Sequence, residues 1–466
     1  MKTIFSDSEF DKLRVFSFIE NAENEFVSVK DVESKFDMTY FIANKVINSL
    51  VSDLESMELD EFFFIEKVNN KYRFQKNGLD SINRLIWKYG RESFVFSLLD
   101  YSIQFPEKTI EDFSFDYYTS LSKAYKTRTE LIEFFAQYSI DFFSHDYLEE
   151  EFRFLVAQLY AGIFKFYEYP FGADILDQVT DIIEFLKTKR IIIDINGFEK
   201  LNLEMYLGLS LLRIKEQVST DKTTKKLFEL KRENLIDIKN YMKEKSFSEE
   251  DIEMLFNFLY VNQFIDKDYN RLDINPELNK KMNFILEHFF AIPEIQVEKE
   301  RLVDPIRSIL LKHVVYKGLI MDQQIFNYLN VLEENYGEII QVVNHFTKNV
   351  EIIKIIGNQT ENKSLLLELT FCLINKISWS ALRKVITISV DFSIGPEYNC
   401  YIMEMIENLP FANLNVNNIF NEETDIYVSD VLGDNLNTHY IIWNSPPTAK
   451  DWKVFGDLVT ELKDKK

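Results

Sequence analysis

The sequence predicts a mainly α-helical protein of several domains that ends in a small α/β domain. Helix breakers are scarce, with 12 glycines and 9 prolines in 466 residues. Hydrophobic residues make up 46% of the chain, enough for several cores, and most of them recur at helical spacing. Near the C-terminus the period changes, and short buried-strand runs alternate with helices. A chain of this length also favours three or more domains.

Composition argues against several classes of protein. No apolar run approaches the roughly 18 residues of a membrane-spanning helix, and the N-terminus lacks a signal-peptide core, so we expect a cytoplasmic protein without a membrane partner. Cys372 and Cys400 are the only cysteines and the five histidines are scattered, which predicts neither a disulfide framework nor a metal site. No nucleotide-binding, hydrolase or metalloprotease motif is present, so we expect neither an enzyme nor a cofactor.

Residues 1–78 are interpreted as a winged-helix unit. Three helices are predicted in succession, the second starting at a capping box formed by Ser28 and Asp31. A hairpin follows over 62–74, where Asn69–Asn70 can adopt positive φ at the turn. Three helices followed by a basic hairpin are typical of a winged helix that contacts DNA. The alternative is an ordinary hairpin made soluble by its lysines.

Residues 79–168 are predicted to hold a linker helix, 79–105, and a second helix-turn-helix unit. Thr109 and Asp112 predict the capped start of a short helix, and a break precedes a longer helix that begins at Leu121. The longer helix has a buried side and a small polar and basic side near its N-terminus. A recognition helix in a major groove needs this arrangement, although two short amphipathic helices with a turn are common in α-rich proteins.

The net charge of −23 argues against nucleic-acid binding at first sight, because an acidic protein repels phosphate. The charge is unevenly distributed, however, with seven basic residues against one acid in 67–91 and three against none in 119–129. Arg128 falls towards the inner side of its helix, where a structural ion pair is the alternative. We expect DNA contacts from side chains of the two recognition helices and the hairpin: Tyr40, Asn44, Lys45, Lys71, Arg73, Ser122, Lys123, Lys126, Thr127 and Arg128.

The segment Ser120–Lys126, SLSKAYK, is similar to the S-x-S-x-x-Y-R recognition-helix pattern of the Mga/AtxA-type regulators of transcription and virulence in Gram-positive bacteria, with Lys126 in place of Arg. The following helix with Glu150–Arg153, EEFR, also resembles that family, as does the domain order along the full length. The resemblance implies two DNA-binding units, two phosphotransferase-system regulatory domains and an enzyme IIB-like C-terminal domain. It also implies a homodimer or higher oligomer, with a phosphotransferase-system phosphocarrier protein as a candidate partner.

Two helical blocks, 169–267 and 268–383, match the expected regulatory domains, and their amphipathic helices predict bundles. The family's domains carry a phosphorylatable histidine on a core-facing helix. In the first block Arg213 fits the family pattern, but Tyr206 stands where the histidine would be. The first block is therefore predicted to accept no phosphate on histidine.

The second block contains His288, His313 and His345, of which His313 and His345 are the candidate phosphorylation sites. A neutral imidazole is nucleophilic near neutral pH, and its phosphorylation adds negative charge. His313 lies on an apolar helix and matches the family pattern better than His345. The alternative for a lone histidine on an apolar helix is a hydrogen-bonded residue of the core.

The last segment, 384–466, is predicted to be an α/β domain with a largely parallel sheet. Its order resembles an enzyme IIB component, in which a nucleophilic cysteine follows the first strand. Here Asp391 or Ser393 stands near that position, Pro396 removes an amide donor and Glu397 repels an anion. We therefore expect subunit contacts rather than phosphotransfer. Strands are predicted at 384–390, 413–419, 425–429 and 439–443, and helices at 400–409 and 451–463.

The sequence therefore predicts a DNA-binding transcriptional regulator, and the resemblance implies control through its helical domains by the sugar phosphotransferase system. Two alternatives remain open: a helical interaction protein without DNA binding, and an RNA-binding antiterminator linked to the same system. The glutamate runs 149–151 and 422–423 are interpreted as solvated faces, because clustered like charges usually face water.

Overall fold

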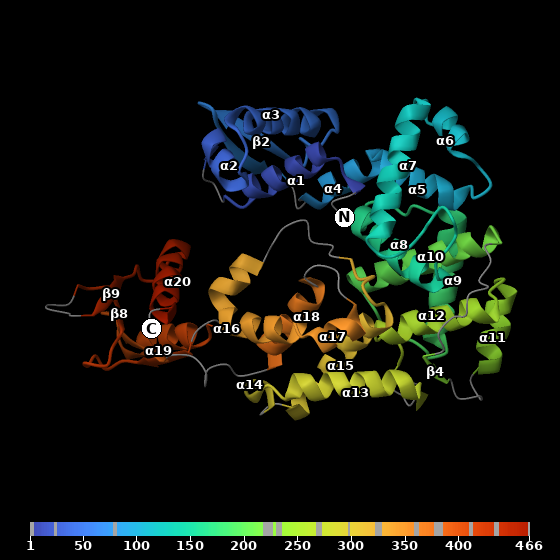
Figure 1. Cartoon of the computed structure of the whole chain (residues 1–466). Helices are drawn as coiled ribbons and strands as arrows, with labels where there is room; N and C mark the ends of the chain where they lie inside the picture. The colour runs from blue at the N-terminus through green and yellow to red at the C-terminus, as the bar shows by residue number, and fades with distance from the viewer. Residues whose placement is uncertain are drawn as a thin grey trace. The chain divides into compact units, whose positions relative to one another are not determined.

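The computed structural model is mainly helical with a small parallel sheet near the C-terminus, as the sequence predicts (Figure 1). Its described residues form two units. Unit 1 comprises Met1–Glu287, Arg307–Asn327 and Val350–Leu365, and unit 2 comprises His288–Ile306, Tyr328–Asn349 and Leu366–Lys466. Within the part of the chain that the structure describes, none of the helices combines the length and the apolar character that a membrane span requires. The structure describes residues 4–22, 26–77, 82–217, 227–229, 235–266, 273–296, 299–321, 329–357, 363–376, 385–409, 413–432 and 438–464.

Unit 1 begins with three helices and a three-stranded antiparallel sheet in the order β1-β3-β2. The predicted turn residues Asn69 and Asn70 have φ of 50° and 60°, and this positive φ matches the twist of a two-residue hairpin. Phe16, Leu50 and Phe63 lie in the common core. The elements are α1 (Asp7–Glu20), β1 (Val27–Ser28), α2 (Val29–Phe36), α3 (Tyr40–Ser56), β2 (Phe63–Val68) and β3 (Lys71–Lys76).

The linker predicted as one helix over 79–105 is two helices, α4 (Ile82–Glu92) and α5 (Phe94–Gln104), so that prediction was wrong. Ser93 separates them. Its hydroxyl accepts a hydrogen bond from the Phe96 amide at 3.2 Å and donates one to the Ile4 carbonyl at 2.5 Å. Serine favours a helix cap over a helix interior because its side chain competes for backbone groups. The short helix α6 (Ile110–Asp116) and the longer α7 (Leu121–Ala136) follow.

The rest of unit 1 is built around α8 (Glu149–Phe164), which is buried along nearly its whole length. It packs against α4 and α10, and the close approach of α4 leaves no room for a side chain at Gly90, next to Ile163. A short antiparallel pair joins β4 to β5. The further elements are α9 (Ala173–Thr188), α10 (Gly197–Lys215), β4 (Phe228–Glu229), α11 (Leu235–Glu244), α12 (Glu249–Val261), β5 (Asp273–Ile274) and α17 (Val350–Ile356), with parts of α13 (Pro276–Phe290) and α15 (Lys299–Val315).

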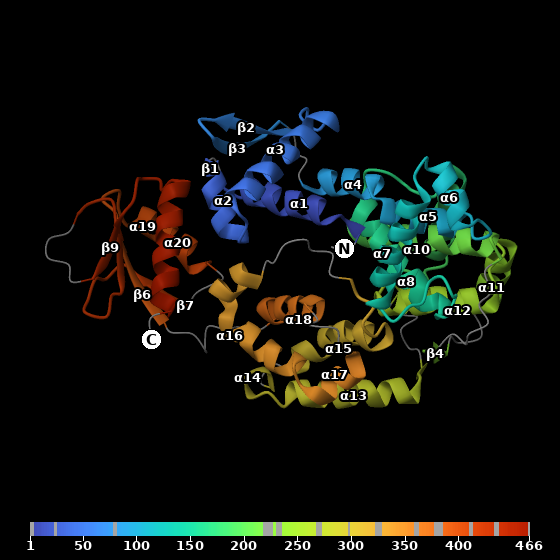
Figure 2. The ribbon, with the colours of Figure 1, turned by 45° about the horizontal axis from the view of Figure 1, so that its top comes forward.

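Unit 2 contains helices and the C-terminal α/β segment. The four-stranded sheet has the order β7-β6-β8-β9 and is entirely parallel. Helices α19 (Pro396–Glu407) and α20 (Ala449–Asp464) pack on one face of this sheet, where Ile388, Ile402 and Phe455 share a core (Figure 2). The elements are α14 (Pro293–Gln296), α16 (Leu329–Thr347), β6 (Val385–Asp391), α19 (Pro396–Glu407), β7 (Asn413–Asn417), β8 (Ile426–Ser429), β9 (His439–Ile442) and α20 (Ala449–Asp464), with most of α18 (Lys363–Lys376).

Candidate nucleic-acid interface

Two pairs of helices, α2–α3 and α6–α7, have the same local construction. In each pair a capping box opens the first helix and a residue with positive φ follows it. A hydroxyl side chain then caps the second helix, and an alanine one turn later is fully buried between the helices. The corresponding residues are Ser28 and Thr109, Asp31 and Asp112, Asp37 and Tyr118, Thr39 and Ser120, and Ala43 and Ala124, always 81 positions apart.

Burial follows the same correspondence. Leu50 and Leu131 are both 0% exposed, and α1 packs on α3 as α5 packs on α7. On the outer side Lys45 and Lys126 occupy corresponding positions, and both are exposed. The two pairs therefore share a buried side, a tight turn and a cationic position on the second helix.

The predicted contact residues of α7 divide into an exposed and a buried group. Ser122, Lys123 and Lys126 are exposed, and the ammonium group of Lys123 lies over the Phe94 ring, 3.3 Å from its centroid. Thr127 is only 2% exposed, in the core position that Val46 has in α3. It does not face outward in this structure, and a DNA contact by Thr127 stays a prediction.

Arg128 lies on the inner side of α7, as its position on the helix predicts. It is half-buried, and its guanidinium stacks on the Phe143 ring at 4.5 Å. An arginine held against a ring is fixed in direction and less free to follow a phosphate. In this structure Arg128 therefore makes a stacking contact with Phe143. A DNA contact by Arg128 stays a prediction.

Helix α3 presents a more apolar outer side than α7 does. Tyr40 is 50% exposed, Lys45 is exposed, and Asn44 is half-buried. The next two residues after Tyr40, Phe41 and Ile42, are 77% and 45% exposed. Helical periodicity predicts an inward-facing Ile42, so its exposure contradicts that prediction.

The basic residues of the β2–β3 hairpin differ in exposure and in pairing. Lys71 is exposed beside the turn, and Lys67 and Lys76 are exposed along the strands. Arg73 instead bonds Glu66 at 2.7 Å and stacks on Phe26, so it brings little net charge to a phosphate. The cationic character of the hairpin therefore comes from its lysines rather than from Arg73.

The other half of the predicted basic island, on α4, serves internal contacts. The guanidinium of Arg84 lies 3.7 Å from the Phe62 ring centroid, and Arg91 forms an ion pair with Glu168. Such contacts join α4 to the hairpin and to the segment after α8. The arginines of the basic segment 67–91 that lie on α4 therefore stabilise the fold, which the composition of the segment alone did not reveal.

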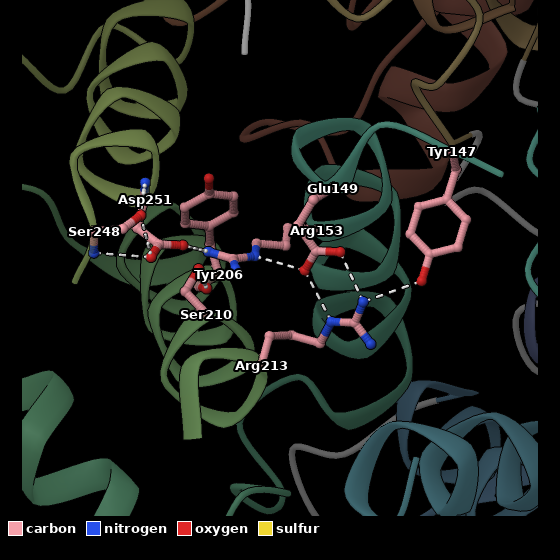
Figure 3. Close-up of polar contacts among 8 residues, drawn as sticks. All are labelled: Tyr147, Glu149, Arg153, Tyr206, Ser210, Arg213, Ser248 and Asp251. Carbon is pink, nitrogen blue, oxygen red and sulfur yellow. Dashed lines mark hydrogen bonds and ion pairs between the residues drawn. The ribbon is translucent and has the colours of Figure 1, made fainter. Parts of the chain in front are cut away.

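A buried charge cluster lies next to the second helix pair, where α8, α10 and α12 meet. We define it as Glu149 and Arg153 on α8, Arg213 on α10 and Asp251 on α12 (Figure 3). Glu149 accepts hydrogen bonds from Arg153 Nε at 2.9 Å and from Arg213 Nε at 2.8 Å and Nη2 at 2.7 Å. Arg153 Nη1 donates to Asp251 at 2.7 Å. Two positive and two negative side chains thus balance inside the unit.

The glutamates at the start of α8 were wrongly interpreted as a solvated face. Glu149 and Glu150 are 7% and 6% exposed, and Glu150 accepts a hydrogen bond from Asn257 at 2.9 Å. Burial alone would raise the pKa of Glu149, but Arg213 and then Arg153 outweigh it, so the pKa lies below its usual value of 4.5. A carboxylate can stay ionised in the interior only with such partners.

The charge cluster ties the second helix pair to the helical part of unit 1. Tyr147, just before α8, accepts a hydrogen bond from Arg213 Nη2 at 3.0 Å, and its ring stacks on Phe152. Phe152 in turn stacks on Phe135 near the end of α7. Both carboxylates of the cluster are paired with guanidinium groups and buried, which suits a structural link between these helices better than catalysis.

The two candidate phosphorylation sites differ in access. His313, on α15, is 1% exposed, so in this conformation its ring is closed to a phosphate donor, and phosphorylation of His313 stays a prediction. His345, on α16, is exposed. Burial of His313 follows from the apolar helix around it, as the alternative interpretation expects.

The loop after β6 is held by hydrogen bonds rather than open at the sheet edge. Ser393 donates from its amide and hydroxyl to Asp430, at 2.8 and 2.5 Å, which lowers the pKa of Asp430. Tyr427 donates to Asp391 at 3.0 Å. Two carboxylates therefore stand at this edge, where an anion would be repelled.

Comparison with known proteins adds no identification. Neither the protein-family models nor the curated proteins give a significant match to this chain.

Proposed function

We propose that this protein is a DNA-binding transcriptional regulator of the Mga/AtxA type, with two helix-turn-helix units in tandem. The observation that carries the proposal is the one-to-one correspondence of the helix pairs α2–α3 and α6–α7, down to the caps, the turn and the buried alanine. A helix-turn-helix places the N-terminal part of its second helix against base edges. Both second helices leave that part exposed, with Lys45 and Lys126 one turn further on.

The first unit has the element order of a winged helix, with the β2–β3 hairpin as the wing. In the proposed complex, Lys67, Lys71 and Lys76 supply phosphate contacts. The second unit has a shorter connection, closed by a bridge between Asp141 and Asp146. The remaining helices are proposed as regulatory domains of the phosphotransferase-system type, and the parallel α/β segment as an enzyme IIB-like domain for subunit contacts in a cytoplasmic homodimer.

Salt dependence of DNA binding by the full-length protein tests this function. Binding to long duplex DNA is measured by fluorescence anisotropy across a salt series. Contact with several phosphates predicts a steep fall in affinity, because released counterions drive binding. A shallow or absent dependence would leave the helical interaction protein as the better description. Tighter binding to RNA hairpins than to duplex DNA would favour the antiterminator.

Charge reversal at the corresponding lysines locates the DNA-binding surface. Lys45→Glu and Lys126→Glu are each expected to weaken binding and to reduce the slope against salt by about 0.9 for each phosphate that is no longer neutralised. Lys200→Glu is the matched control, because Lys200 pairs with Glu204 one turn later, as Lys126 pairs with Glu130. Equal effects of the control and of Lys126→Glu would refute a specific role for α7.

A further inference from the structure

The first turn of α3 exposes three consecutive apolar side chains. Tyr40 is 50% exposed, Phe41 77% and Ile42 45%. Runs of exposed apolar residues on a helix are uncommon without a function. The corresponding positions on α7 are Leu121, Ser122 and Lys123, two of them polar. The two units thus have the same construction but different chemistry at the same place.

The major groove offers a specific partner for this surface. Base pairs present mostly hydrogen-bonding groups there, and the apolar exception is the C5-methyl group of thymine. Asn48, exposed further along α3, has the amide that pairs with the groove edge of adenine. An aromatic side chain followed by an asparagine therefore suits A·T pairs better than G·C pairs.

We propose that the first turn of α3 reads thymine methyl groups, with Phe41 as the principal contact. This inference rests on the proposed DNA-binding function and specifies its target: a half-site rich in A·T pairs for the first unit. Ser122 and Lys123 give the second unit a polar surface, so the half-site for α7 is read by hydrogen bonds instead. The two half-sites consequently differ in base composition.

Replacement of thymine by uracil tests the proposal directly, because it removes only the methyl group. Full-length protein is used to select duplexes from a random pool, and the best duplex is then prepared with deoxyuridine at each thymine in turn. One buried methyl corresponds to about a fourfold change in affinity. We expect about fourfold weaker binding at one or two positions within one half-site and no change elsewhere.

Phe41→Ala is expected to weaken binding to the thymine duplex and to leave binding to the uracil duplex nearly unchanged, so that the ratio of the two affinities approaches one. Phe41 is mostly exposed, so the variant should fold, which circular dichroism checks. The matched control is Phe115→Ala on α6, because Phe115 is 80% exposed but lies on the first helix of its pair. It should keep the thymine-to-uracil ratio of the unaltered protein.

Two results would overturn the proposal. Uracil duplexes could bind as tightly as thymine duplexes, or Phe41→Ala could keep the full ratio. In the second case, a lower mass of the Phe41→Ala protein in sedimentation would assign this surface to contact with a second protein copy. Salt-dependent binding without any methyl effect refutes only this inference, whereas absence of binding to every duplex refutes the proposed function as well.

Discussion

Glu149→Gln tests how strongly the charge cluster holds unit 1 together. The change keeps the shape of the side chain but removes the negative charge that faces both Arg153 and Arg213, each 1% exposed. Removal of one partner from a buried ion pair costs about 3–5 kcal/mol, because the other charge stays buried without compensation. Since two guanidinium groups lose their shared carboxylate, we expect a destabilisation towards the upper end of this range.

Hydrogen exchange of full-length protein is the appropriate assay, because a chain of several domains need not unfold in a single step. Amide protection in α8 and α10 should fall in Glu149→Gln, while the C-terminal sheet keeps its protection. Glu184→Gln, at an exposed position on α9, is the control and should change stability by less than about 0.5 kcal/mol. Unchanged protection of α8 and α10 in Glu149→Gln would refute a stabilising role of the cluster.

We expect amide protection to depend on pH differently in the unaltered protein and in Glu149→Gln. The folded-state pKa of Glu149 lies below its usual value of 4.5, so its contribution to stability is complete above about pH 4.5 and is lost as the pH falls through the folded-state value. Unaltered protein should therefore lose protection in α8 and α10 on acidification below pH 4.5 more steeply than Glu149→Gln does. Parallel pH profiles of the two proteins would contradict this assignment.

Three further predictions concern single side chains. Tyr206→Phe should raise the free energy of unfolding by about 1 kcal/mol, because the buried Tyr206 hydroxyl has no hydrogen-bond partner among the described residues; chemical denaturation measures this, and a loss of stability would contradict it. Lys71→Ala should reduce the salt slope of DNA binding by about 0.9, and an unchanged slope would exclude a phosphate contact. Thr127→Val should leave DNA affinity within about twofold, whereas Ser122→Ala should weaken it several-fold; the reverse order in anisotropy titrations would assign the base contact to Thr127 despite its burial.

Local signals in the sequence determined the boundaries of several elements. The capping boxes at Ser28 and Thr109 start α2 and α6 where they were predicted, and Asn69–Asn70 forms the predicted hairpin turn. The parallel sheet near the C-terminus was also correctly predicted, from short strand runs that alternate with helices. The caps and the turn depend on groups within about four residues of one another, so a short stretch of sequence contains all the information for them. The sheet differs, because its parallel pairs join distant residues such as Ile388 and Ile426.

The tertiary structure alone decided which charged and polar side chains are buried. The glutamates at the start of α8 look like a solvated run in sequence, but their partners come from distant helices: Arg213 lies 64 residues after Glu149, and Asp251 lies 98 residues after Arg153. Thr127 has the spacing of an outer-face residue near the recognition turn, yet packing places it in the core. Whether a charge faces water or a partner depends on the three-dimensional contacts that offset its desolvation cost, and no local pattern contains those contacts.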